Sequence, residues 1–152
     1  MRERSEGMTL EQMKVKEFHE AFGLLINDVP TLPGLETVAL RESLIREELQ
    51  EFSQACFRRD IVSAADALAD LLYVVYGAAV SLGVDMEPVF DEVHRSNMTK
   101  VGGHRREDGK WVKPDTYSPA RLELILEAQG KAEGTLEKIL KENLEPGYNR
   151  GI

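Results

Sequence analysis

The chain has 152 residues, a net charge of −8 and a single cysteine, Cys56. Its length fits one domain, 1–152, with a sizeable core, and a lone cysteine allows no internal disulfide, so we expect a cytoplasmic protein. The acidic balance argues against a nucleic-acid-binding protein, and Asp66 and Asp70 interrupt the longest apolar segment, so we expect no membrane partner.

The first half of the chain predicts three helices. Thr9 and Gln12 have the spacing of a capping box, and the helix that they begin is broken by the prolines and glycine of residues 30–34. A second helix is expected from about Leu35 to Phe57. Asp60 is a plausible N-cap for a third, about Ile61 to Leu82, which is apolar on nearly all sides and therefore central to a core.

The second half predicts a fourth helix and then a change of character. Gly83 ends the third helix and Asp85 caps the fourth, about Met86 to Met98. Residues 101–118 read as a long loop, in which Lys110 to Lys113 could form a hairpin arm. Ser118 and Pro119 are typical of a helix start, and another helix is expected near residues 135–143. We therefore predict an all-α fold: a four-helix bundle core with additional C-terminal helices and a long loop around 101–118.

Two acidic patches are the most informative feature of the chain. Glu47, Glu48 and Glu51 share one face of the second helix, and Asp66 and Asp70 lie four apart in the apolar third helix. If the patches met without a counter-ion, each like-charge pair at about 5 Å would cost roughly 3 kcal/mol at an effective dielectric of 20. A divalent cation removes that cost, and carboxylate oxygens suit Mg²⁺ or Mn²⁺.

The turn between these helices gives the two patches a common register. With its centre near residue 59, residue 51 lies opposite about residue 67 and residue 47 opposite about residue 71. The alternatives are a solvated glutamate face, an ordinary acid near a helix start for Asp66, and an ion pair between Asp70 and an arginine. The candidate arginines are Arg46, Arg58 and Arg59.

A second group of polar residues could contact phosphate. Asn97 and Lys100 lie three apart at the end of the fourth helix, and the loop that follows is locally basic, with Arg105 and Lys110 among its cations. A mobile flap that places cations on an anionic substrate is one interpretation. The alternatives are a lysine that interacts with the helix dipole and a solvated loop.

These residues together resemble a known family. Glu47-Glu48-x-x-Glu51, the segment 67–77 and the segment 90–100 are similar to motifs of the MazG-like all-α nucleoside triphosphate pyrophosphohydrolases, a superfamily that includes dimeric dUTPases and phosphoribosyl-ATP pyrophosphohydrolase. The resemblance implies Mg²⁺ held by Glu48, Glu51 and Asp70, with Glu47 as a ligand or a water-orienting group, and phosphate contacts from Asn97 and Lys100. One position departs from the family, since its Glu-x-x-Asp motif has Ala67 in place of glutamate, and Asp66 could take that role.

The expected function is Mg²⁺-dependent hydrolysis of a (deoxy)nucleoside triphosphate, with dUTP among the candidates, to the monophosphate and pyrophosphate. Glu47 or Glu48 would accept a proton from the attacking water, and Glu47, Glu48, Glu51, Asp66 and Asp70 would hold the metal. Phosphoribosyl-ATP hydrolysis and a non-enzymatic helical interaction module remain alternatives. A di-iron bundle is disfavoured, because the chain has no Glu-x-x-His. The apolar third helix also favours a homodimer or homotetramer.

Overall fold

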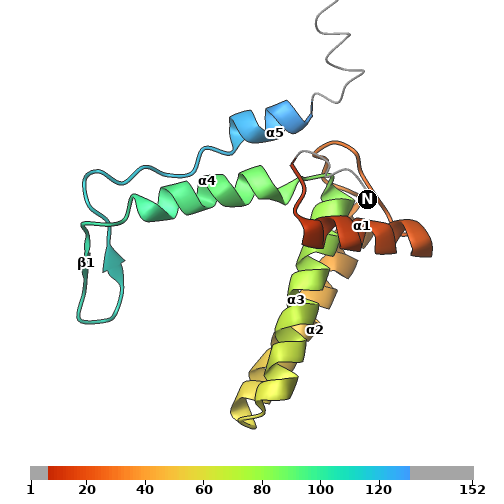
Figure 1. The fold of residues 1–152 in the computed structure, drawn as a ribbon, viewed down its shortest axis with the longest axis horizontal. Coiled ribbons are helices and arrows are strands. Elements are labelled where there is room, and N and C mark those ends of the chain that lie inside the picture. The colour runs from red at the N-terminus through yellow and green to blue at the C-terminus, as the bar shows by residue number, and fades with distance from the viewer. Residues whose placement is uncertain (1–6, 131–152) are drawn as a thin grey trace, which may run out of the picture.

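The structure is a computed structural model that describes residues 7–130. It confirms the all-α class, with five helices and one small hairpin in this part of the chain (Figure 1). The elements are α1 (Leu10–Phe22), α2 (Leu35–Phe57), α3 (Ile61–Leu82), α4 (Met86–Met98), β1 (His104–Arg105), β2 (Trp111–Val112) and α5 (Glu123–Gln129). The bounds of α2, α3 and α4 are those expected from the sequence.

Local chemistry explains where the helices begin and end. Thr9 Oγ1 accepts a hydrogen bond from the Gln12 amide at the start of α1, and the Asp60 carboxylate accepts from the amides of Val62 and Ser63 at the start of α3. Gly83 ends α3 at φ 68°, and a Cβ there would lie 2.2 Å from the Val29 carbonyl oxygen. Only glycine meets both requirements without strain.

The packed core is built by α1, α2 and α3. α2 and α3 form an antiparallel hairpin, and α1 lies across it near the C-terminal end of α3 (Figure 1). Much of the buried apolar surface comes from small side chains, which let the helix backbones approach closely. They include Val15, Ala55, Ala64, Ala67, Ala79 and Val80.

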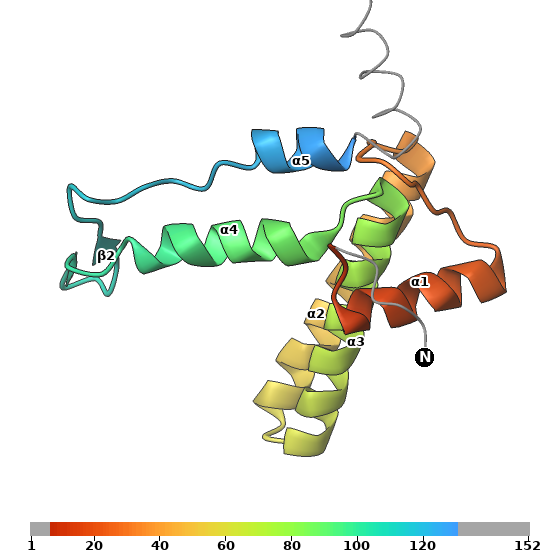
Figure 2. The ribbon, with the colours of Figure 1, turned by 45° about the horizontal axis from the view of Figure 1, so that its top comes forward.

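The expected four-helix bundle needs one refinement, because α4 does not lie alongside the hairpin. In Figures 1 and 2 it leaves the end of α3 and extends away from α2 and α3 as a separate arm. The Gln12 side chain, 1% exposed, holds this junction: its Nε2 donates to the Val84 carbonyl at 2.7 Å and its Oε1 accepts from the Met86 amide at 2.9 Å. Of the expected capping box, only the hydrogen bond to Thr9 Oγ1 forms. The Gln12 side chain instead bonds to residues around the start of α4 and so connects α1 to α4.

The long loop contains the suggested hairpin, in which His104 pairs with Val112 and Arg105 with Trp111. Ser118, however, does not cap a helix, since α5 begins at Glu123 with Leu122 at its N-cap position. The Ser118 carbonyl instead accepts from Ser96 Oγ at 2.8 Å.

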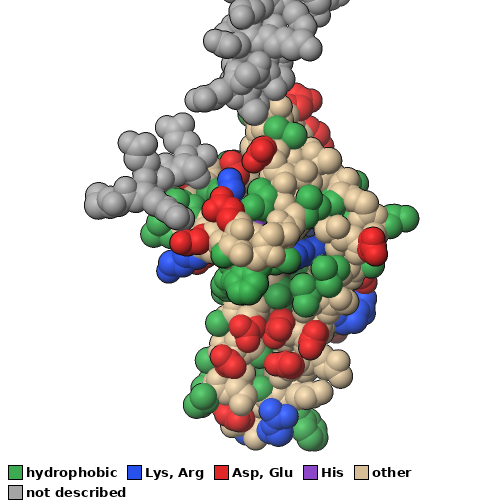
Figure 3. All heavy atoms as spheres, turned by 90° about the vertical axis from the view of Figure 1, so that its right-hand side faces the viewer, with side chains coloured by type: hydrophobic (Ala, Val, Ile, Leu, Met, Phe, Trp, Pro, Cys, Tyr) green, Lys and Arg blue, Asp and Glu red, His purple; other side chains and the backbone are tan. Residues whose placement is uncertain are grey.

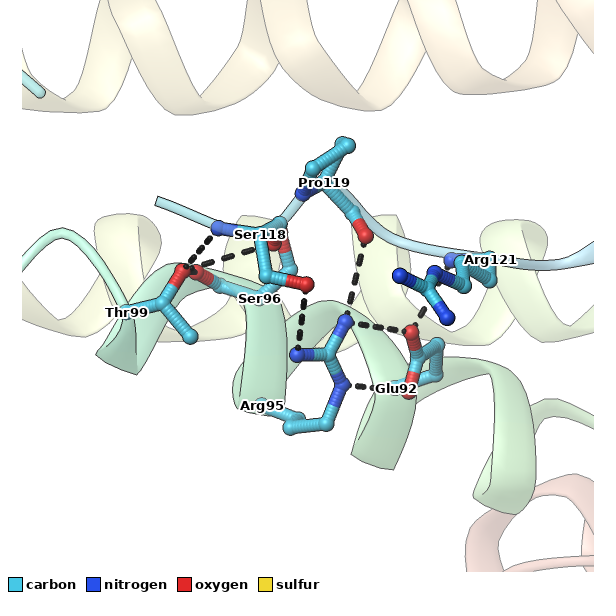
Figure 4. Close-up of polar contacts among 7 residues, drawn as sticks. All are labelled: Glu92, Arg95, Ser96, Thr99, Ser118, Pro119 and Arg121. Atoms are coloured by element: carbon cyan, nitrogen blue, oxygen red, sulfur yellow. Dashed lines mark hydrogen bonds and ion pairs between the residues drawn. The ribbon is translucent and has the colours of Figure 1, made fainter. Parts of the chain in front are cut away.

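The segment before α5 is fastened to α4 by further polar contacts (Figure 4). The Arg95 guanidinium donates to Ser118 Oγ and the Pro119 carbonyl, and Glu92 pairs with Arg95 and accepts from the Arg121 amide. The hydroxyl and backbone groups of Ser118 are thus bonded to α4 and are not available to cap a helix. The helix start that Ser118 and Pro119 suggest does not form. The further helix expected near residues 135–143 lies outside the described residues.

One flank of α3 is left uncovered in the single chain. Leu68 and Leu72 on α3 are 45% and 58% exposed, and Phe90 on α4 is 67% exposed. Within residues 7–130, α3 is the one helix that is long and apolar enough to cross a membrane, by length and composition only. Asp66 and Asp70 lie in the same helix, and each would be costly inside a bilayer.

Candidate functional site

The five predicted acids are neighbours on the α2–α3 hairpin, with Glu48 at their centre. Glu48 is half-buried, and its Oε2 is buried with no hydrogen-bond partner. Burial raises the pKa of Glu48, and the charges of Glu51, Asp70, Glu47 and Asp66 raise it further, in that order. The acids of α3 therefore act on an acid of α2 from across the helix interface, as the predicted register requires.

The other four carboxylates lie on the surface around Glu48. Glu47, Glu51, Asp66 and Asp70 are all exposed. Figure 3 shows acidic side chains gathered on the α2–α3 hairpin, bordered by hydrophobic side chains on the side of α1.

An arginine partner for Asp70 was the main alternative, and it is not observed. Arg46 pairs with Glu42, one turn earlier on its own helix. No ion pair joins Asp70 to Arg46, Arg58 or Arg59 in the part of the chain that the structure describes. The acids thus accumulate negative charge that no basic side chain within residues 7–130 pairs with.

The donor chemistry of this cluster fits a hard dication. Carboxylate oxygens are the ligands that Mg²⁺ and Mn²⁺ prefer, and the unpartnered Oε2 of Glu48 lacks only a cation or a donor. Across residues 7–130, however, no three of these carboxylates already stand in a closed ligand arrangement. The carboxylates are therefore neighbours, but their oxygens do not converge on one point.

The structure shows where Ala67, which replaces the glutamate of the family motif, and its neighbour Asp66 lie. Ala67 is 3% exposed in the interface between α2 and α3, whereas Asp66 is exposed at its rim. Asp66 is the weakest of the four charges that act on Glu48. Asp66 therefore belongs to the cluster without occupying the position of the missing glutamate.

The four predicted phosphate contacts form a second group at the far end of α4. Lys100 Nζ donates to Asn97 Oδ1 at 2.6 Å, and the indole N–H of Trp111 donates to the Lys100 carbonyl at 2.8 Å, which joins the hairpin to α4. Arg105 and Lys110 are exposed on the hairpin. Because α4 points away from α2 and α3, this cationic group and the acidic cluster lie on different arms of one chain (Figures 1 and 2).

Sequence reasoning did not single out a buried cation beside the acids. Arg41 is 8% exposed, and its Nε is the other buried side-chain atom, besides Glu48 Oε2, that has no hydrogen-bond partner among the described residues. The signal was present in the spacing, since Arg41 precedes Glu48 by seven residues and therefore lies on the same face of α2.

Comparisons with known proteins identify the family of this chain. The family model for phosphoribosyl-ATP pyrophosphohydrolase matches residues 15–97, which include α2, α3 and most of α1 and α4. The chain belongs to this family, which lies within the MazG-like all-α superfamily. A curated relative, "Uncharacterized protein L479" of Acanthamoeba polyphaga mimivirus, is 35% identical over 77 residues. That match covers 48% of this chain and 31% of the relative.

Proposed function

We propose that this member of the family hydrolyses a (deoxy)nucleoside triphosphate to the monophosphate and pyrophosphate with the help of Mg²⁺, for which Mn²⁺ could substitute. One observation carries the proposal: four carboxylates surround a half-buried Glu48 whose Oε2 has no partner, and no basic side chain within residues 7–130 forms an ion pair with this cluster. Such a cluster is costly unless it binds a cation, and a polyphosphate is the substrate that brings Mg²⁺ with it.

The acidic residues have two proposed roles, metal binding and proton transfer. Glu48, Glu51 and Asp70 are assigned to hold Mg²⁺, with Glu47 and Asp66 completing the negative field. When bound, Mg²⁺ supplies charge neutralisation and acidifies a bound water. Glu47 or Glu48 accepts the proton from the attacking water.

The phosphate-binding role falls to the cations on the α4 arm. Asn97, Lys100, Arg105 and Lys110 are assigned to the polyphosphate, where positive charge stabilises the leaving pyrophosphate. In one chain these residues lie away from the acids (Figure 2). A second copy of the chain, seated on the exposed apolar flank of α3 and α4, can supply the missing half of each site.

The proposed homodimer rests on that apolar flank and on charge. A hollow of about 360 Å³ lies between α3 and α4 and is lined largely by apolar side chains, including Leu72, Tyr76 and Phe90. The acidic hairpin of one copy and the basic arm of another are complementary in sign. A tetramer made of two such dimers is equally compatible with this pairing.

Replacing Asp70 tests the enzymatic proposal. Asp70→Asn should lower kcat by at least about a hundredfold while leaving the helical circular dichroism spectrum unchanged, because the side chain is exposed and keeps its shape. Glu42→Gln, which changes an exposed acid on α2 outside the cluster, serves as the matched control. Near-normal turnover by Asp70→Asn would refute the metal assignment.

Mixing variants tests the shared site. Glu48→Gln and Lys100→Ala should each be inactive alone, yet their co-refolded mixture should regain about a quarter of the wild-type rate, since a statistical mixture contains dimers with one intact site. No recovery in a mixture that has been shown to contain heterodimers would place both groups of residues in the same chain.

The substrate range separates the remaining alternatives. Incubation with individual nucleoside triphosphates and with phosphoribosyl-ATP, with monophosphate and diphosphate products resolved, distinguishes the proposed activity from phosphoribosyl-ATP hydrolysis. A purely structural helical module would hydrolyse none of them and would show no thermal stabilisation by Mg²⁺.

A further inference from the structure

The junction of α1, α2 and α3 contains a buried cation that pairs with no anion among the described residues. The chain folds Arg41 of α2 against Gly77 of α3: a Cβ at Gly77 would lie 2.9 Å from Arg41 Nη1 and 3.2 Å from His19 Nε2. Arg41 and His19 are 8% and 1% exposed. The absence of a side chain at residue 77 is therefore what makes room for the guanidinium.

The guanidinium of Arg41 has one buried nitrogen, Nε, that lacks a partner in the described part of the chain. Within residues 7–130 it takes part in no hydrogen bond or ion pair, and its Nε is buried without a partner. Burial lowers the pKa of Arg41, and no carboxylate counteracts this effect. A buried, unpaired charge destabilises a fold, so a residue that serves only stability would not be an arginine here.

His19 lies beside Arg41 at Gly77 and carries no charge that could neutralise it. Its Nδ1 donates to the Leu25 carbonyl at 3.0 Å, an oxygen that also accepts from Ser81 Oγ, which leaves Nε2 beside the guanidinium. Burial, and to a smaller extent the charge of Arg41, lower the pKa of His19, so the ring is neutral near pH 7. Arg41 thus lies beside this ring, and no acceptor within residues 7–130 binds its N–H groups.

The order of residues along the α2–α3 interface indicates what could reach this cation. Arg41 lies seven residues before Glu48 and Gly77 seven after Asp70, which places the cation about 10 Å from the acidic cluster at 1.5 Å per residue. Between them lies Tyr73, whose ring meets Phe18 of α1 edge to face at 5.6 Å.

These two aromatic rings are partly exposed, and Phe18 is also stacked on Phe22 with ring centroids 4.2 Å apart. Phe18 and Tyr73 are 38% and 40% exposed, and hydrophobic side chains border the acids on the α1 side in Figure 3. An exposed aromatic surface suits the face of a nucleobase. Acids, aromatic rings and cation therefore follow one another over the length of a nucleotide.

We infer that Arg41, which lies over Gly77 beside His19, is the specificity-determining residue of this site and selects nucleobases that present a keto oxygen toward it. The inference rests on the proposed function, because the acids must hold the phosphate end of the nucleotide for the base to reach Arg41. A guanidinium offers only donors, so it binds a keto oxygen and is unmatched by an amino group at the same position. The 8% exposure of Arg41 suffices for contact through its terminal N–H groups.

Two substrate pairs test the selection, since each pair differs at one ring position by keto against amino. Wild-type kcat/KM should be at least about tenfold higher for dITP than for dATP, and higher for dUTP than for dCTP, because a site with unpaired donors rejects the amino analogue. Arg41→Met should reduce both ratios to within about threefold of unity. Its melting temperature should equal or exceed that of wild type, because an unpaired buried charge has been removed.

A second variant moves the guanidinium without removing it. Gly77→Ala places a methyl group 2.9 Å from Nη1 and should also reduce the keto preference, while the helix interior tolerates alanine well. Gly34→Ala is the matched control, because its Cβ meets nothing within 4 Å. The control should retain the wild-type ratios.

The outcomes separate this inference from the proposed function. Hydrolysis of all four nucleotides without keto preference, or a preference that survives Arg41→Met, overturns the role of Arg41 and leaves the enzymatic proposal standing. If none is hydrolysed, the enzymatic proposal fails, and calorimetric binding of dIMP against dAMP decides the inference. Equal affinities of the two monophosphates would then refute it.

Discussion

Neutralising Glu48 should change the stability of the protein in opposite directions with and without Mg²⁺. The carboxylate of Glu48 is acted on by four like charges, and its buried Oε2 has no partner. Glu48→Gln keeps the shape of the side chain, removes the charge and provides an amide that can donate to a neighbouring carboxylate. Without metal, the variant should therefore unfold at a higher temperature than wild type.

The size of the effect follows from Coulomb's law. Because the four surrounding acids are exposed, a water-like dielectric applies, and each pair at about 7 Å costs about 0.6 kcal/mol. Four pairs cost about 2 kcal/mol, and salt at 0.15 M reduces this to about 1 kcal/mol. For a chain of this size, a stabilisation of 1–2 kcal/mol corresponds to a rise in melting temperature of about 2–8 °C.

Mg²⁺ should reverse the order of the two proteins. A cation at a hundred times its dissociation constant stabilises the folded state by about 2.7 kcal/mol, and wild type should gain this while Glu48→Gln gains little. Differential scanning calorimetry across an Mg²⁺ series measures both melting curves, with Glu42→Gln as the control that should follow wild type. A variant that melts below wild type in EDTA, or equal Mg²⁺ shifts for both proteins, would refute the reasoning.

Three further predictions concern the helix ends and the α4 arm. Gly83→Ala should lower the free energy of unfolding by at least about 2 kcal/mol in urea titrations, because the new Cβ clashes with the Val29 carbonyl and the backbone is left-handed. Gly23→Ala is the control: its backbone is also left-handed, at φ 64°, but no atom lies near the new Cβ, so it should cost about 1 kcal/mol. Asp60→Ala should cost about 1 kcal/mol of unfolding free energy through loss of the α3 N-cap, and Asp60→Asn should restore most of it; equal losses would refute the capping role. The hydrogen bond from Arg95, and then that from the Arg121 amide, lower the pKa of Glu92 from 4.5 to about 2, so its contribution is present above about pH 4.5 and is lost as the pH falls toward 2. Acid titrations of the melting temperature should therefore fall more steeply over this range for wild type than for Glu92→Gln.

The sequence alone determined the bounds of α2, α3 and α4 and the acidic register. Short-range signals were sufficient: the Asp60 cap, the Gly83 stop and the apolar period of α2 and α3 are local, and a tight turn between two helices places Glu48 near Asp70 by arithmetic. The roles assigned to the acids, to Asn97 and Lys100 and to the hairpin cations remain predictions.

Only the tertiary structure decided the direction of α4, the use of Ser118 and the position of Arg41. The direction of α4 depends on Gln12 bonds to residues more than 70 positions away, and Ser118 is taken by contacts with α4. Arg41 is buried only because α1, α2 and a glycine of α3 meet around it. Contacts between residues far apart in sequence leave no periodic trace in the chain, which is why pattern and spacing could not predict them.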